Sequence, residues 1–171
     1  FDVQVDVSRF YHHYAISLQR IDQPTAAQTK LETALDLNPH HIPSLQAIGP
    51  LYILTEDWRA AERVYRQLIQ LIEGTAQDSQ LSGVYTSLGC VEVALGKPER
   101  AKKRFNKALK LHPSNIRALK GVADVLHHER DWNTLLSTYN NIIHYADVRT
   151  DVVAAYLAKG RILHQEMKLP K

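Results

Sequence analysis

The residues best suited to chemistry in this chain of 171 residues are its nine histidines. Adjacent pairs occur at 12–13, 40–41 and 127–128. Histidine is a common zinc ligand, but neighbours on a helix point about 100° apart, so such a pair does not hold one ion. The best set, Asp124 with His128 one turn later and His127 beside it, has neither the HExxH arrangement nor a cysteine partner. The sequence therefore predicts no metal site and leaves open a pH-sensitive surface.

Cysteine chemistry is limited to Cys90, the only cysteine of the chain. No internal disulfide can form, which favours a reducing compartment, so we expect a cytoplasmic (intracellular) location. No neighbouring base would activate Cys90 as a nucleophile. A glycine-rich phosphate loop, a catalytic carboxylate pair and a catalytic triad are also missing from the sequence. We therefore predict no catalytic residue, no cofactor and no enzyme activity within these residues.

The charge balance is mildly basic, with a net charge of +3 and a pI near 9.0. Such a balance permits an acidic partner without requiring one. The densest basic run, at 102–110, lacks the long stripe and the stacking aromatics that single-stranded nucleic acids require. It is typical of a solvated helix face. No apolar run approaches 18 residues, so the sequence predicts neither nucleic-acid binding nor insertion into a membrane.

Internal repetition is the strongest pattern in the chain. The phrase LETALDLNPHH at 31–41 returns as FNKALKLHPSN at 105–115, an offset of 74 residues, and the Asp-Trp pair at 57–58 returns at 131–132. Apolar residues recur at three- and four-residue spacing, which predicts helices with one buried face. The chain divides into 34-residue units at 8–41, 42–75, 82–115 and 116–149. Spacers lie at 76–81 and 150–152, and a lone helix equivalent to the first helix of a unit follows at 153–167.

Each unit contains two predicted helices separated by a short break. Pro24 and Pro98 suit a first helical turn, where the missing N–H group has no helical partner to lose. Asp57 and Asp131 can cap the corresponding helices of the other two units. Small residues such as Gly49 and Gly89 allow the paired helices to approach closely. No unit can bury its apolar face alone, so the pattern predicts stacking of neighbouring units.

The third unit carries YTSLGCVE, AKKRF and HP in the order and spacing of the tetratricopeptide repeat. The chain therefore resembles that family over about residues 8–167, although Glu92 stands in place of the expected tyrosine and the fourth unit departs at Leu135, Ile142 and Asp147. The resemblance implies an all-α, right-handed α-solenoid, or superhelix, of stacked antiparallel helix–turn–helix repeats. We expect one domain over 8–171, with residues 1–7 belonging to the remainder of a longer chain.

In folds of this family the first helices line the concave side, where such proteins usually bind. Helical spacing then predicts which side chains face a partner. The predicted groove residues are Arg9, His12, Gln46, Pro50, Ile53, Thr86, Cys90, Val93, Arg117, Lys120, Asp124, His127 and Arg161. The middle of this groove is small and apolar and its ends are basic or titratable, which favours an amphipathic helix or extended peptide with acidic flanks.

Two specialised binding modes of the family are not supported by these positions. The clamp for a chaperone's terminal carboxylate needs Lys and then Asn four residues later, whereas this chain has His12 with Ile16 and Lys120 with Asp124. The asparagine ladder of sugar-transferring relatives is missing as well. Pro50 lies inside a predicted helix, so we expect a kink there, or a carbonyl left free for a ligand.

The function that the sequence predicts is a non-catalytic protein–protein interaction scaffold. One alternative is a regulatory or substrate-recruiting segment of a larger enzyme whose catalytic domain lies outside this chain. Self-association is also possible, because the end of a solenoid exposes apolar surface unless it is capped.

Overall fold

The structure is a computed structural model that describes residues 3–166 and contains helices but no strand in that range. The all-α prediction is confirmed. The chain divides into two compact units, Phe1–Thr75 and Ala76–Lys171. Each unit is built from pairs of helices joined by short turns, as the 34-residue period predicts.

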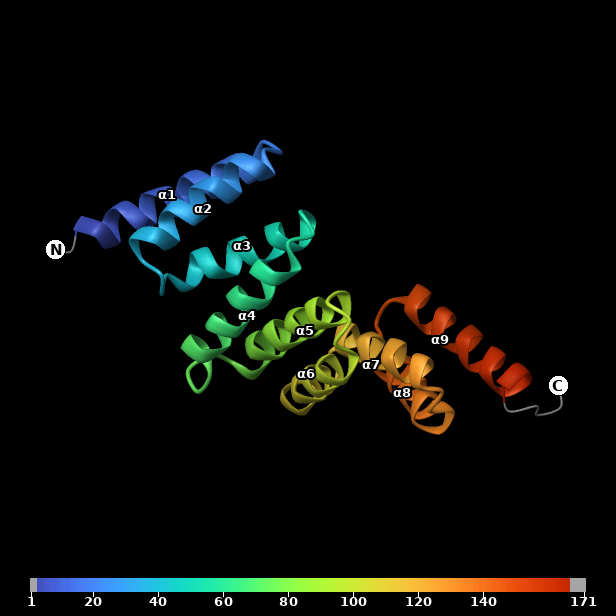
Figure 1. The fold of residues 1–171 in the computed structure, drawn as a ribbon. Coiled ribbons are helices and arrows are strands. Elements are labelled where there is room, and N and C mark those ends of the chain that lie inside the picture. Colours follow the sequence, from blue (N-terminus) through green and yellow to red (C-terminus); the bar gives the residue numbers. More distant parts are fainter. Residues whose placement is uncertain (1–2, 167–171) are drawn as a thin grey trace. The chain divides into compact units, whose positions relative to one another are not determined.

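Unit 1 contains two helical hairpins: α1 (Val3–Arg20) with α2 (Pro24–Leu37), and α3 (Ile42–Leu54) with α4 (Trp58–Ile72). Within each hairpin the two helices lie side by side, and α2 also packs on α3 (Figure 1). The core contains the small and large residues that the period predicts: Ala15, Leu31, Ile48 and Ala61 are each fully buried.

Unit 2 contains α5 (Asp78–Ala94) with α6 (Pro98–Leu111), α7 (Ile116–Glu129) with α8 (Trp132–Tyr145), and a last helix, α9 (Arg149–Arg161), which packs on α8 (Figure 1). A short π-helix, Ile162–Glu166, continues α9. Leu119, Ile142 and Ala155 join α7, α8 and α9 in one buried cluster.

The helix ends follow the predicted signals. Pro24 and Pro98 occupy first turns, and the carboxylates of Asp57 and Asp131 accept hydrogen bonds from the backbone N–H groups of Ala60 (3.0 Å) and Thr134 (3.2 Å). The turn after each first helix contains a left-handed residue; these are Asp22, Glu56, Gly96 and Arg130, with φ between 55° and 70°. Only one of the four is a glycine, the residue that adopts this conformation without steric cost.

Close approach explains the glycines at helix contacts. A Cβ atom on Gly49 would lie 2.7 Å from the Tyr65 ring, and one on Gly89 would lie 2.5 Å from the Phe105 ring. A Cβ atom on Gly121 of α7 would also lie 2.5 Å from the Phe105 ring. The aromatic ring of α6 therefore occupies space that side chains on both α5 and α7 would need.

Several helices begin before the predicted units. Helix α1 begins at Val3, five residues before the first predicted unit. Helix α5 begins at Asp78 and α9 at Arg149, so both spacers largely belong to helices. Neither spacer contains Gly or Pro, so no residue in it prevents the following helix from beginning earlier than predicted. The predicted end of the last helix at 167 lies outside the described residues, and the single domain over 8–171 stays a prediction.

Candidate binding surface

The predicted groove residues of unit 1 lie on α1 and α3. Arg9, Gln46 and Pro50 are exposed, while His12 and Ile53 are half-buried. Pro50 sits inside α3, which continues past it to Leu54. Gln46, Pro50 and Arg9 therefore lie at the surface, whereas the His12 ring contacts residues at the start of the next hairpin.

His12 belongs to a polar contact between α1 and the start of α3. Its ring lies edge-on to the ring of His41, with 5.3 Å between the centroids. The Ser44 hydroxyl lies 2.7 Å from Nδ1 of His41 and 3.4 Å from Nδ1 of His12, and so links the two imidazoles. This contact between helices is a role that the groove prediction did not give to His12.

Burial lowers the pKa of both histidines below the ordinary value. For His12, repulsion from His41 and His13 lowers the pKa further. For His41, the charges of Arg9 and His13 add to the effect of burial. Both rings therefore favour the neutral form, in which a ring nitrogen can accept a hydrogen bond.

Unit 2 has a different set of residues at the corresponding junction. Thr86, predicted to face a partner, is instead buried at 1% exposure. The Asn115 amide donates to the hydroxyls of Ser82 (2.8 Å) and Thr86 (3.0 Å), while Ser82 donates to the carbonyl of Ala108 (2.9 Å). Thr86 is buried because α7 begins directly over it. The Thr86 hydroxyl donates to the carbonyl of Ser82 in α5 (2.8 Å) and accepts from Asn115 at the start of α7, so it is unavailable to a partner.

The other predicted residues of unit 2 remain at the surface to different extents. Cys90 is half-buried and Val93 is 43% exposed on α5. Arg117 and Arg161 are exposed on α7 and α9, and a guanidinium nitrogen of Arg117 lies 3.5 Å from the Ser87 hydroxyl. His127, also exposed, packs its ring edge-on against Trp132 at 5.7 Å.

Two predicted groove residues, Lys120 and Asp124, line a pocket between α7, α8 and α9. Its volume is about 260 Å³. Tyr139 of α8 and Asp151 of α9 complete its polar lining. The remaining lining is apolar and mostly small, consisting of Ala123, Ile142, Ala154, Ala155 and Ala158. The alanines leave the space that larger residues would fill.

The charges of the pocket are unevenly balanced. Nζ of Lys120 lies 2.7 Å from a carboxylate oxygen of Asp151, so these two charges form an ion pair. Partial burial raises the pKa of the Asp124 carboxyl, although the nearby His128, His127 and Lys120 lower it. Burial and then the charge of Asp124 raise the pKa of the Tyr139 hydroxyl. Asp124 and Tyr139 are therefore electrostatically coupled across the pocket.

Sequence reasoning missed Tyr139 and Asp151 as lining residues. Asp151 falls in the predicted spacer at 150–152, and Tyr139 lies on the second helix of its hairpin, α8, whereas the groove prediction used first helices only. A signal for Asp151 did exist, because it is an acidic residue in the first turn of α9, where the helix dipole favours negative charge.

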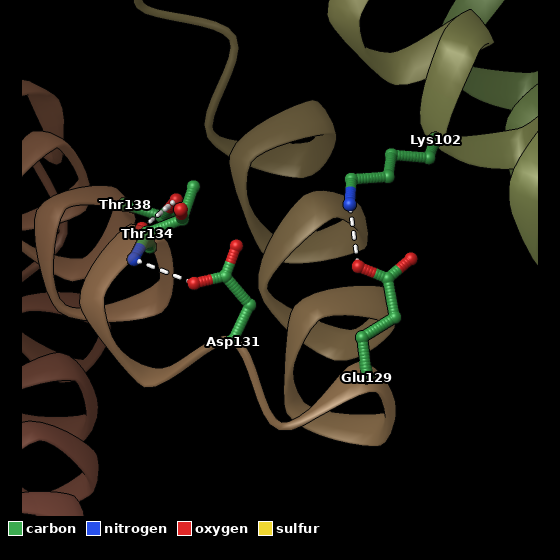
Figure 2. A network of polar contacts seen from close by, with 5 residues as sticks. All are labelled: Lys102, Glu129, Asp131, Thr134 and Thr138. Carbon is green, nitrogen blue, oxygen red and sulfur yellow. Dashed lines mark hydrogen bonds and ion pairs between the residues drawn. The ribbon is translucent and has the colours of Figure 1, made fainter.

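The outer basic run is engaged in contacts within unit 2. Lys102 pairs with Glu129 across α6 and α7 (Figure 2). Lys107 lies over the ring of Tyr85, 4.6 Å from the centroid. Figure 2 also shows Asp131 accepting the hydrogen bond from the Thr134 backbone. Side-chain and then backbone hydrogen bonding with Thr134 lowers the pKa of Asp131.

Among the described residues, no group of three His, Cys, Asp or Glu side chains is placed to hold a metal ion. Within the same range, no helix combines the length and the apolar character needed to cross a membrane.

Comparisons with known proteins agree with this architecture. Residues 86–132 match the family model of the tetratricopeptide repeat. The BBSome complex member BBS4 of Bos taurus is 23% identical over 128 residues, which is 75% of this chain and 23% of that protein. The chain therefore spans about a quarter of the length of this relative.

Two solved structures illustrate the shared fold. The crystal structure of YrrB, described as a tetratricopeptide-repeat protein with an unusual peptide-binding site, is 19% identical, with coverage of 92% of this chain and 80% of that chain and a TM-score of 0.69. A mutant of the O-GlcNAc transferase of Thermobaculum terrenum is 21% identical, with coverage of 85% and 27% and a TM-score of 0.65. At these identities the likeness shows a shared fold. The family match and the fold together support an assignment to the tetratricopeptide repeat family.

Proposed function

We propose that this tetratricopeptide-repeat chain is a non-catalytic protein–protein interaction module that captures a peptide or helix of a partner on its first helices. The fold supports a protein-binding role, since repeats of this kind generally serve as interaction modules. The observation that carries the proposal is the pocket of about 260 Å³ at α7–α9, because two of the predicted groove residues line it. The peptide-binding site ascribed to YrrB is consistent with this use of the fold.

Exposed basic residues of each unit suggest how a partner would be oriented. In unit 2, Arg117 and Arg161 are exposed on α7 and α9; in unit 1, Arg9 is exposed on α1. Acidic groups on a partner would be steered toward such side chains, mainly through the association rate. Val93 offers an exposed apolar contact on α5. Lys120 contributes less to this steering, because Asp151 already neutralises it.

Partner capture by the immobilised chain from a cell lysate tests the proposal, with bound proteins quantified by mass spectrometry. The double variant Arg117→Glu/Arg161→Glu should lose a partner that the parent chain retains. Its matched control is Lys103→Glu/Lys110→Glu, which makes the same change of net charge at exposed positions of α6. Equal capture by both double variants would contradict the proposed surface.

A second candidate function is the regulatory or substrate-recruiting segment of a larger enzyme. The observation that favours it is the likeness to part of an O-GlcNAc transferase, of which this chain covers 27%. Under this hypothesis the partner is a substrate, and the Arg117→Glu/Arg161→Glu variant of the whole protein would raise KM for a protein substrate. It would leave turnover of a short model substrate unchanged.

A further inference from the structure

The pocket at α7–α9 contains two polar groups that its own residues leave without a hydrogen bond. Within the described residues, neither the Asp124 carboxylate nor the Tyr139 hydroxyl has a hydrogen-bond partner, whereas Lys120 and Asp151 pair with each other. A carboxylate offers acceptors only, and a phenol oxygen can also accept. Both groups line the same pocket, so a donor placed there could reach the two together.

The charge of the lining selects among donors. The ion pair between Lys120 and Asp151 is neutral as a unit, so the lining residues carry one negative charge in excess, that of Asp124. A cationic group would complement that charge, whereas an anionic group would meet repulsion. Charge-assisted hydrogen bonds to a carboxylate are also stronger than neutral ones.

The size and the apolar wall restrict the occupant further. A volume of about 260 Å³ lies below the range of about 300–1,000 Å³ that is typical of pockets for drug-sized ligands. Ala154, Ala158 and Ile142 supply apolar surface next to the polar groups. Lysine and arginine side chains have this combination, because their methylene stems lie along apolar surface while the charged end remains polar.

We propose that the pocket between α7, α8 and α9 receives one basic side chain, lysine or arginine, of the partner segment. The stem lies against the alanines of α9, and the cationic end donates to the Asp124 carboxylate and the Tyr139 hydroxyl. This inference rests on the proposed function for the identity of the partner as a protein. It adds that the partner segment places one basic side chain in this pocket, in addition to the acidic groups that are expected elsewhere on that segment.

Small capped amino acids test the pocket without any knowledge of the partner. Nα-acetyl-lysine N-methylamide, the arginine analogue, the isosteric norleucine analogue and the glutamate analogue would each be titrated to 50 mM into the ¹⁵N-labelled chain at low salt. The lysine or arginine probe should shift amide signals of α7–α9 and bind about twofold to fivefold more tightly than norleucine, the ratio that a partly exposed ion pair supplies. Added salt should reduce this preference.

Three variants separate the contributions. Asp124→Asn should abolish the preference for the basic probes, whereas Asp147→Asn, the same charge change at an exposed position outside the pocket, should preserve it. Ala158→Leu should block all probes by filling the space. Circular dichroism checks that each variant is folded.

Equal binding of norleucine, tighter binding of glutamate, or no binding of the basic probes at 50 mM would each overturn the inference. So would a basic preference that survives Asp124→Asn. None of these results bears on partner capture through Arg117 and Arg161, so the pocket inference and the proposed function fail separately.

Discussion

Replacing Gly89 by alanine should destabilise unit 2, although the same change normally stabilises a helix. Alanine in place of glycine in a helix interior contributes about 1 kcal/mol through helix propensity. At Gly89, however, the new Cβ would lie 2.5 Å from Cε1 and 2.8 Å from Cδ1 of Phe105. Carbon atoms prefer about 3.5–4.0 Å, so the ring would have to retreat by about 1 Å.

Retreat of the ring is restricted by its surroundings. Phe105 is 1% exposed, and the positions where Gly89 and Gly121 would carry a Cβ both lie within 2.5 Å of its ring. Overpacking of such a site costs about 1–3 kcal/mol, which exceeds or cancels the gain in propensity. We therefore expect Gly89→Ala to lower the free energy of unfolding by up to about 2 kcal/mol.

Gly83 of the same helix is the matched control. Nothing lies within 4 Å of the Cβ position at Gly83, which is exposed. Gly83→Ala should therefore raise the free energy of unfolding by about 0.5–1 kcal/mol. Urea unfolding followed by circular dichroism measures both changes, and each 1 kcal/mol corresponds to a shift in Tm of about 2–4 °C for a chain of this length.

A double-mutant cycle locates the cause. If the ring is responsible, Gly89→Ala should cost much less in a Phe105→Leu background, giving an interaction energy of about 0.5–3 kcal/mol between the two sites. Equal stabilisation by Gly83→Ala and Gly89→Ala would refute the reasoning, because it would show that the helices adjust without strain.

Two further predictions concern the turns and the histidine contact. Arg130 has a φ of 58°, while Gly96 occupies the corresponding turn of the preceding hairpin. Arg130→Gly should therefore raise the free energy of unfolding, measured by urea titration, by about 1 kcal/mol. An unchanged urea midpoint would argue against strain in this turn. The pKa values of His12 and His41 are lower in the folded chain than the ordinary value, so below pH about 6.5 the unfolded chain binds more protons, and stability should fall as the pH drops through that value. His12→Thr/His41→Asn should reduce this acid-side loss in urea unfolding between pH 5 and 8, and identical pH profiles would contradict the assignment.

The helices and their ends could be predicted because their signals are local. Asp57 and Asp131 cap the helices whose starts they mark, and Gly89 meets a large ring as its small size suggested. It was harder to predict which side chains are exposed to a partner. Helical spacing says which residues share a face, but whether the next hairpin covers that face depends on packing between helices, and Thr86 lies under the start of α7.

Glu92 shows the same limit for a single residue. It stands where the tetratricopeptide repeat has a tyrosine. In the structure its carboxylate is fully buried, 3.5 Å from Nε of Arg104 on the neighbouring helix α6. The pairing joins two helices, so no spacing within either helix predicts it. A buried charge is retained only where such partners exist, which makes Arg104 a structural residue of the outer basic run.

The two halves of the 74-residue repeat keep one hydrogen bond and change the chemistry beside it. Ser8 donates to the carbonyl of Ala34 in unit 1 at 2.9 Å, as Ser82 does to Ala108 in unit 2 at the same distance. At the neighbouring positions, unit 1 has His12 and His41 where unit 2 has the neutral pair Thr86 and Asn115. A hydroxyl and an amide do not titrate near neutrality, whereas two imidazoles in contact do. We therefore expect acid to weaken the His12–His41 contact in unit 1 and to leave the Thr86–Asn115 contact in unit 2 unchanged, so that the second contact is an internal control for the titration.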